Sequence, residues 1–328
     1  MNLYVSHMSA LRYWRQFEGL STSDASKVRV LKNPVCSTKD ARLIMPAEHG
    51  LIMQPGHPLD VLVPSESARR YAKDLRPHVW AGEVPMGAFR KIGPNLFVSS
   101  PEFTYVQLAL SFSVIELAQV GNELCGGYFL MAFSGFQTRL GKRPITSRRK
   151  IANMIDRVVE VRGAKRAREA LRWVADHCDS PMETNTLLVL CLPKRLHGWS
   201  LCMPVMNKVI RVTERMRPFV GGELYKPDFY WERTVDGRIL RITGEYDSSE
   251  CHDADLDAEA TRIRRNDMKA MGYLVTSINR SQMASANSMQ YPARQIARDL
   301  GVYRRAPSLE MLSRQDELLR LLRRERFR

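Results

Sequence analysis

Three carboxylates late in the chain have the types and spacing that hold a metal ion. Asp228 stands inside an apolar and aromatic run, and Glu245 and Asp247 end the next apolar run. An acid in such a run is costly unless it is paired or bound to a cation. Glu245 and Asp247 flank Tyr246, so in a strand both would point to one face. Hard oxygen ligands of this kind suit Mg²⁺ or Mn²⁺, which activates water and polarises phosphoryl groups.

Two further residues could act as the base in such a site. His252 follows the second acidic run, although a histidine there is more often an ordinary loop residue. Glu183 lies in Ser180-Pro-Met-Glu, which also fits a capping box, in which the glutamate only satisfies the helix terminus. Both interpretations of Glu183 stay open. The candidate catalytic residues are Glu183, Asp228, Glu245, Asp247 and His252.

The charge of the chain suggests an anionic partner. The formal net charge is +15, and residues 137–172 hold twelve Arg and Lys against three acids, a local charge of +9. Residues 302–328 add eight Arg against four acids. One such cluster is usually a solvated helix face, but two of them flanking an acidic site favour nucleic acid. We therefore expect DNA as a partner, contacted by Arg148, Arg149, Lys150, Arg264 and Arg265.

A hairpin must position the carboxylates. Asp236-Gly237 is a strong turn signal between the two apolar runs, and it sets Asp228 and Glu245 at adjoining strand ends. We expect at least one raised pKa among carboxylates crowded in this way. A helix opening at Ser180, short strands around 201–205 and 209–212, the hairpin, a helix at 256–271 and a strand at 273–278 predict an α/β sandwich around a mixed sheet.

The rest of the chain predicts a mixed N-terminal domain and basic helices. Helices are expected near 7–14, after Ser100 and across 113–124, with strands at 61–63, 78–80 and 96–98. Basic helices follow Ser147 and Gly163, and residues 308–328 form a terminal helix. The expected divisions are a specificity or partner domain at 1–135, a basic helical connector at 136–178, a nuclease-like domain at 179–300 and a basic terminal helix at 301–328.

The cysteines and the hydropathy of the chain predict the cellular compartment of the protein. The six cysteines form no Cys-x-x-Cys pair, which is typical of reduced thiols in the cytoplasm. No apolar run approaches the ~20 residues of a membrane span, so we expect no membrane partner. A protein partner could bind the N-terminal domain or the terminal helix.

The region 180–280 resembles the PD-(D/E)xK restriction-endonuclease-like superfamily, in particular the branch of the very-short-patch-repair (Vsr) mismatch endonucleases. The matching pieces occur in family order: Ser180-Pro-Met-Glu, Pro227-Asp-Phe, Gly244-Glu-Tyr-Asp with His252, and the run from Arg264-Arg-Asn-Asp to Tyr273-Leu-Val-Thr. The resemblance implies a nuclease fold and a metal held by Asp228, Glu245 and Asp247. Asp247 stands where the superfamily has its usual lysine, and Ser248 where the relatives have glycine.

The N-terminal part is more distantly similar to AbiEi-type antitoxins of abortive-infection systems. The similar pieces are Ser6-His-Met-Ser-Ala-Leu-Arg-Tyr-Trp, Ser100-Pro-Glu-Phe-Thr-Tyr and Asn122-Glu-Leu-Cys-Gly. Together the two resemblances imply a metal-dependent DNA endonuclease in phage defence or DNA repair. The alternative is a non-catalytic DNA-binding regulator or antitoxin built on a nuclease-like scaffold, and metal binding by the acidic cluster separates the two.

Overall fold

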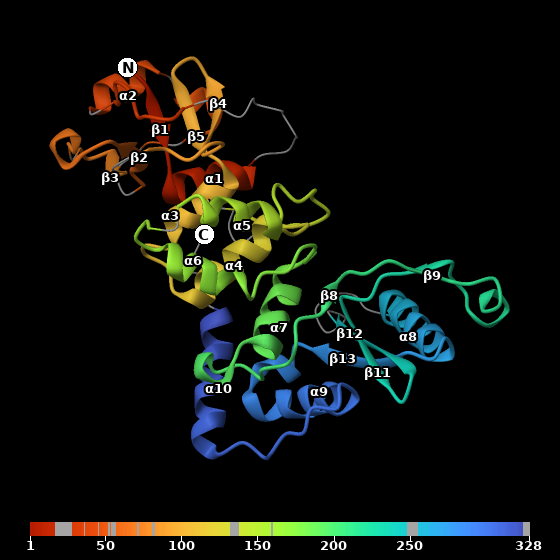
Figure 1. The fold of residues 1–328 in the computed structure, drawn as a ribbon. Helices are drawn as coiled ribbons and strands as arrows, with labels where there is room; N and C mark the ends of the chain where they lie inside the picture. Colours follow the sequence, from red (N-terminus) through yellow and green to blue (C-terminus); the bar gives the residue numbers. More distant parts are fainter. Residues whose placement is uncertain are drawn as a thin grey trace. The chain divides into compact units, whose positions relative to one another are not determined.

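The structure is a computed structural model that divides into two compact units, Met1–Val174 and Ala175–Phe327 (Figure 1). Among the residues it describes, no helix is long and apolar enough to cross a membrane. The residues outside the description are 17–27, 36, 45, 52, 54–56, 71, 81–82, 132–137, 159, 248–254 and 324–328, together with the side chains of 255–258.

The first unit contains a five-stranded mixed sheet of order β3-β2-β1-β5-β4. β1 runs parallel to β5 and antiparallel to β2. The strands are short and largely apolar, and side chains of β1, β2 and β5 share one core with Ala10 and Trp14 of the first helix. The strands are β1 (Leu3–Val5), β2 (Leu59–Val63), β3 (Leu75–Val79), β4 (Phe89–Gly93) and β5 (Leu96–Ser99).

Helices complete the first unit, and serines begin four of them, including Ser37 before α2. Ser100, Ser113 and Ser147 each accept a hydrogen bond from the backbone N–H three residues on, as N-caps do. The elements are α1 (His7–Gln16), α2 (Thr38–Leu43), α3 (Pro101–Leu108), α4 (Val114–Leu124), β6 (Phe129–Leu130), β7 (Thr138–Arg139), α5 (Arg148–Asp156) and α6 (Ala164–Leu171).

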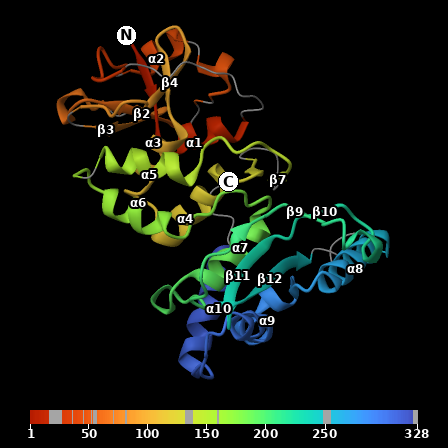
Figure 2. The same ribbon diagram turned by 45° about the vertical axis from the view of Figure 1, so that its right-hand side comes forward.

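The segment expected as a connector at 136–178 instead packs largely into the first unit. The apolar stripe of α5, which includes Ile151 and Ile155, shares a buried core with Leu171 and with side chains of α3 and α4. Figure 2 shows the ribbons of α5 and α6 beside α3 and α4. An amphipathic helix stabilises a fold only when its stripe is covered, so these basic helices belong to the core rather than to a linker. The chain leaves the unit at Val174.

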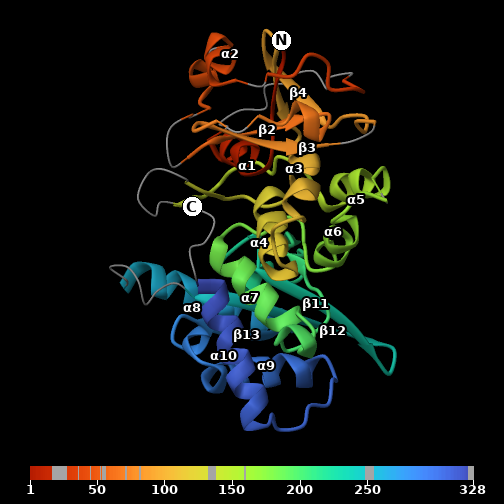
Figure 3. The ribbon, with the colours of Figure 1, turned by 90° about the vertical axis from the view of Figure 1, so that its left-hand side faces the viewer.

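The second unit is a four-stranded mixed sheet of order β13-β12-β11-β8 with helices on it (Figure 3). The predicted hairpin is present: β11 pairs antiparallel with β12 around Asp236 (φ 48°) and Gly237 (φ 74°). Tyr230 and Val275 pack on one face with Met268 of α8, while α7 and α9 also contact the sheet. The elements are α7 (Pro181–Cys191), β8 (Val205–Met206), β9 (Ile210–Arg211), β10 (Leu224–Tyr225), β11 (Phe229–Val235), β12 (Arg238–Asp247), α8 (Asp255–Ala270), β13 (Leu274–Asn279), α9 (Ala286–Asp299) and α10 (Leu309–Arg323).

The predicted α/β class is confirmed, with mixed sheets and helices in both units. Some elements differ from expectation. The strand expected at 201–205 begins only at Val205, and α9 was not predicted, because Pro292 inside it signals a helix end. The terminal helix, expected as a separate segment, packs on α7 and α9, and Asn185 donates a hydrogen bond of 3.3 Å to the carbonyl of Leu322.

Candidate functional site

Asp228 lies immediately before β11, and its side chain contacts the end of β12. The next residue, Phe229, pairs with Gly244, so the register sets Asp228 opposite Glu245 on the same face of the sheet. Asp228 Oδ2 accepts a hydrogen bond of 2.7 Å from the backbone N–H of Tyr246. The hairpin thus brings together the two acids that the sequence placed at adjoining strand ends, and it fixes the carboxylate of Asp228.

Glu245 is buried, with 2% of its surface exposed, and it contacts two arginines of α8. Arg264 Nε lies 3.2 Å from Oε1 and Arg265 Nε lies 3.5 Å from Oε2. Oε2 nevertheless accepts no hydrogen bond from any described residue. A carboxylate this buried requires neighbouring cations, and here the arginines supply them.

Asp247 lies two residues beyond Glu245, at the end of β12, and shares an arginine with it. Arg265 Nη2 lies 2.5 Å from Asp247 Oδ2 while its Nε faces Glu245. Arg264 and Arg265, which the sequence suggested as phosphate contacts, therefore form ion pairs with two of the predicted metal ligands. Charge balance is consistent with this arrangement, because the arginines of α8 neutralise buried Glu245 and neighbouring Asp247.

Glu183 lies in the first turn of α7, where Ser180 caps the helix. Its Oε2 accepts hydrogen bonds from the backbone N–H of Asp179 at 2.9 Å and from Asn207 Nδ2 at 2.6 Å. The backbone N–H of Asn207 also donates to the carbonyl of Asp228 at 3.0 Å. Glu183 therefore reaches back along the chain as a capping residue does, and Asn207 also links it to the acidic strand end.

The expected raised pKa is present in this cluster. Burial, then the charge of Glu183 and to a smaller extent that of Glu245, raises the pKa of Asp228 to about 7. Burial also raises the pKa of Glu183, against the hydrogen bonds that it accepts. The carboxylates are close enough to disfavour one another's ionisation, even with Arg264 nearby.

The fit of these residues to a divalent cation is partial. Within the described part of the chain, no group of three or more His, Cys, Asp or Glu side chains is arranged to hold a metal ion. Two observations still favour an added cation: Oε2 of Glu245 accepts no hydrogen bond from a described residue, and the pKa of Asp228 is raised. Asp228 and Glu245 would be the ligands of such an ion, although Glu245 faces Arg264 and Arg265, and Asp247 also faces Arg265.

Part of the predicted site lies outside the described residues. His252 belongs to the segment 248–254, as does Ser248. The predicted role of His252 as a base therefore stays a prediction.

The predicted DNA-contact residues of the first unit lie in the first turn of α5. Arg148, Arg149 and Lys150 are exposed, and Arg148 Nε donates to the carbonyl of Leu171 at 3.2 Å. The side chains of Arg149 and Lys150 form no hydrogen bond or ion pair with any residue that the structure describes. Positive charge at a helix N-terminus opposes the helix dipole, so this turn is suited to an anionic partner.

Other basic residues of the same region have structural roles. Arg166 Nη1 donates to the carbonyls of Ala109 and Phe112, at 2.9 and 3.1 Å, beyond the end of α3. Arg168 forms an ion pair with Asp156 at 3.1 Å. The local charge of +9 in the sequence is therefore only partly available to a ligand.

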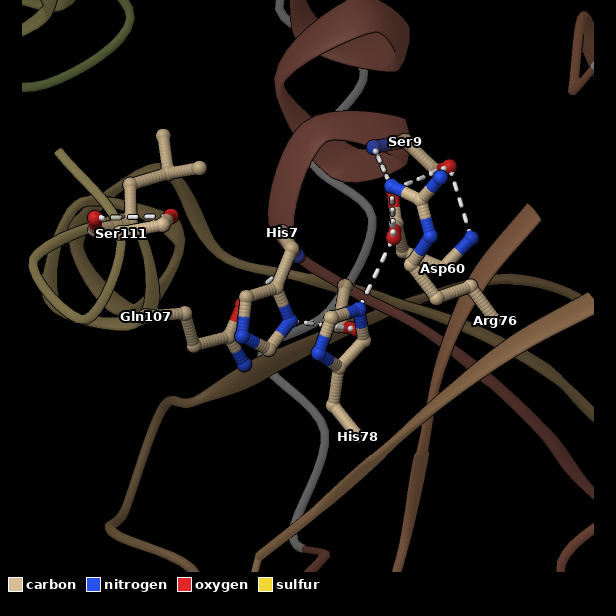
Figure 4. A network of polar contacts seen from close by, with 9 residues as sticks. His7, Ser9, Asp60, Arg76, His78, Gln107 and Ser111 are labelled. Carbon is tan, nitrogen blue, oxygen red and sulfur yellow. Dashed lines mark hydrogen bonds and ion pairs between the residues drawn. The ribbon is translucent and has the colours of Figure 1, made fainter. Parts of the chain in front are cut away.

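A second polar network, in the first unit, was missed from the sequence (Figure 4). His78 Nε2 lies 2.8 Å from Asp60 Oδ1, and Ser9 donates its hydroxyl to Asp60 Oδ2 at 3.0 Å. The ring of His7 stacks on His78 with centroids 3.7 Å apart, and its Nε2 is buried without a hydrogen bond. Asp60 was the available signal, since it stands inside the buried strand Leu59–Val63 just as Asp228 stands in an apolar run.

Asn207 is a site residue that sequence reasoning did not identify. It has a φ of +50°, and its Nδ2 donates to both Glu183 and the carbonyl of His177. Asparagine tolerates this left-handed conformation, which is a turn signal but not a signal for a site.

No family model, no curated protein and no solved structure matches the chain, so the function rests on this geometry.

Proposed function

We propose that the protein is a metal-dependent endonuclease-like hydrolase that cleaves DNA phosphodiester bonds, in a phage-defence or DNA-repair setting in the cytoplasm. The observation that carries the proposal is the pairing of half-buried Asp228 with buried Glu245 at facing strand ends, with the pKa of Asp228 raised to about 7. Perturbed acids that converge in this way are typical of functional sites. The resemblance to PD-(D/E)xK nucleases supports the same assignment.

In this proposal, different residues of the chain bind the metal, position water and contact the phosphate. Asp228 and Glu245 would hold Mg²⁺ or Mn²⁺, with Asp247 as a further ligand if Arg265 turns away. A bound divalent cation would polarise the scissile phosphate and lower the pKa of water. Asn207 would position Glu183, which could then hold a water molecule or accept its proton, and His252 is the other candidate base. Arg264, exposed at its side chain to 43%, could reach a phosphate oxygen.

The test is metal-dependent cleavage by the wild type and the Asp228→Asn variant. Asparagine keeps the shape and an acceptor for the Tyr246 N–H but removes the negative charge. We expect cleavage of labelled DNA to fall by roughly 100-fold or more and calorimetric Mn²⁺ uptake to be lost. Glu232→Gln is the matched control, because Glu232 is an exposed acid on the same strand. Absence of metal uptake and of cleavage in the wild type would contradict the proposal.

The ion pairs of α8 favour a second candidate, a non-catalytic DNA-binding regulator or antitoxin on a nuclease-like scaffold. Arg264 and Arg265 neutralise Glu245 and Asp247 without any metal. The Arg265→Gln variant separates the candidates by its melting temperature. In a metal site, the destabilised variant regains stability when Mg²⁺ replaces the lost charge. If the protein is a non-catalytic scaffold, the Arg265→Gln change lowers the melting temperature by the same amount with and without Mg²⁺.

A further inference from the structure

A basic and aromatic groove lies in the second unit, along α9 and the chain that follows it. Its volume is about 890 Å³, and residues 287–306 contribute all of its described lining. We name it the α9 groove; its principal side chains are Tyr291, Arg294, Arg298, Tyr303 and Arg304. The spacing of Tyr291, Arg294 and Arg298 places these three side chains on one face of the helix.

The groove is positively charged and its arginines are incompletely paired. Three arginines line it, and no aspartate or glutamate is among the described lining residues. The Nε of Arg304 is buried without a hydrogen bond, and burial lowers the pKa of this guanidinium. No ion pair joins Arg294 or Arg304 to a described carboxylate. A partly desolvated cation without an acid beside it is suited to an anionic ligand.

Two tyrosines of the groove are open to solvent. Tyr291 is 73% exposed and Tyr303 is 87% exposed. Single exposed aromatic residues are common on protein surfaces, but these two line one groove together with arginines. Aromatic rings beside a basic surface are the elements with which proteins bind single-stranded nucleic acid, since every base has a face that can stack.

The groove is built into the fold. Gly301 (φ +67°) follows α9, and a Cβ at this position would lie 1.9 Å from Arg233 Nη1 of β11. The backbone N–H of Val302 donates to the carbonyl of Ala297 at 2.7 Å and turns the chain back along the helix. Arg233 is five residues from Asp228 along the chain, a backbone separation of about 17 Å in an extended strand.

We propose that the α9 groove binds a single-stranded segment of nucleic acid. Bases stack on Tyr291 and Tyr303, and the guanidinium groups of Arg294 and Arg304 contact the phosphates. The inference deepens the proposed function, because it names single-stranded nucleic acid as a feature of the ligand. It is carried by the groove itself and does not require cleavage.

The test is the binding of a fluorescent oligothymidylate of about twelve nucleotides, a length within the range of single-strand sites. Fluorescence anisotropy in EDTA keeps the oligonucleotide intact. We expect Tyr291→Ala and Tyr303→Ala each to weaken binding about tenfold, because each removes one stacking platform. The matched Tyr→Phe variants keep the ring and should bind within about twofold of wild type. Melting temperatures establish that all four variants fold.

An abasic oligonucleotide of the same length distinguishes stacking from charge. It should bind the wild type more weakly than oligothymidylate and should not discriminate between the wild type and the alanine variants. Arg304→Ala should reduce the slope of log K against log salt by about 0.7, the value for one phosphate of a single strand. Alanine variants that bind oligothymidylate as the wild type does would overturn the proposal. Equal competition by polyglutamate would assign the groove to acidic proteins and would also overturn it.

Different experimental results would overturn the nuclease proposal and the proposal for the α9 groove. Asp228→Asn should bind oligothymidylate in EDTA like the wild type, since Asp228 does not line the groove. Loss of stacking-dependent binding with cleavage intact overturns only the groove. Stacking-dependent binding without any cleavage overturns only the nuclease.

Discussion

At the scale of single residues, two acids beside apolar strand residues, Asp60 in β2 and Asp228 just before β11, have pKa values shifted in opposite directions. Asp60 is held by His78 and Ser9; burial alone would raise its pKa, but these hydrogen bonds and the neighbouring histidines lower it. Asp228 faces other carboxylates, and its pKa is raised to about 7. The first acid is satisfied within the protein, whereas the second leaves an excess of negative charge that a ligand can neutralise.

His7 makes the stability of the first unit depend on pH. Burial, together with the neighbouring His78, lowers the pKa of His7 to about 3. Below about pH 6.5 the unfolded chain binds a proton that native His7 does not bind, so stability falls as the pH drops from about 6.5 toward 3. Between pH 7.5 and 5, this one residue should cost about 2 kcal/mol.

The His7→Asn variant measures that contribution. Asparagine tolerates the φ of +46° at this position and does not titrate. In urea unfolding at about pH 7.5 and 5, the variant should lose about 2 kcal/mol less stability than the wild type. The control is His57→Asn, which changes an exposed histidine of the same unit. An equal loss in wild type and His7→Asn would show that His7 titrates normally.

At the scale of elements, local signals predicted much of the fold. Serine caps located α3, α5 and α7, and Asp236-Gly237 located the hairpin that joins the two acidic strands. What local signals could not predict depends on tertiary packing. The helix α9 continues through Pro292, whose side chain is buried. The pairing of Arg265 with Glu245 and Asp247 requires α8 to lie beside the end of β12, which no spacing in the sequence specifies.

The hairpin turn offers a clean test of its backbone conformation. Gly237 has a φ of +74°, and a Cβ added there would meet nothing within 4 Å. Gly237→Ala should therefore destabilise the second unit by roughly 1 kcal/mol through the left-handed conformation alone. Asp236→Asn keeps a preferred type I′ turn and should change stability by less than about 0.5 kcal/mol. Urea denaturation of both variants provides the measurement, and a neutral Gly237→Ala would show that the turn adopts another conformation.

At the scale of the whole molecule, a formal charge of +15 promotes association with polyanions. In the structure, some basic residues pair with groups of the protein, whereas others are left for a ligand. Arg166 and Arg168 have partners within the first unit, and Arg264 and Arg265 neutralise acids of the second. Arg149 and Lys150 on α5 and the arginines of the α9 groove remain as the best candidates for phosphate contact. Net charge therefore overstates the number of contacts that DNA can make.

The salt dependence of duplex DNA binding tests this division. Each phosphate contact contributes about 0.9 to the slope of log K against log salt, so Arg149→Ala with Lys150→Ala should lower the slope by about 1.8. Arg29→Ala with Arg314→Ala is the matched control. It removes the same charge from arginines already paired with Glu83 and Glu310, at 3.4 and 2.6 Å, and should change the slope much less. If both double variants change the slope equally, net charge rather than the first turn of α5 determines binding.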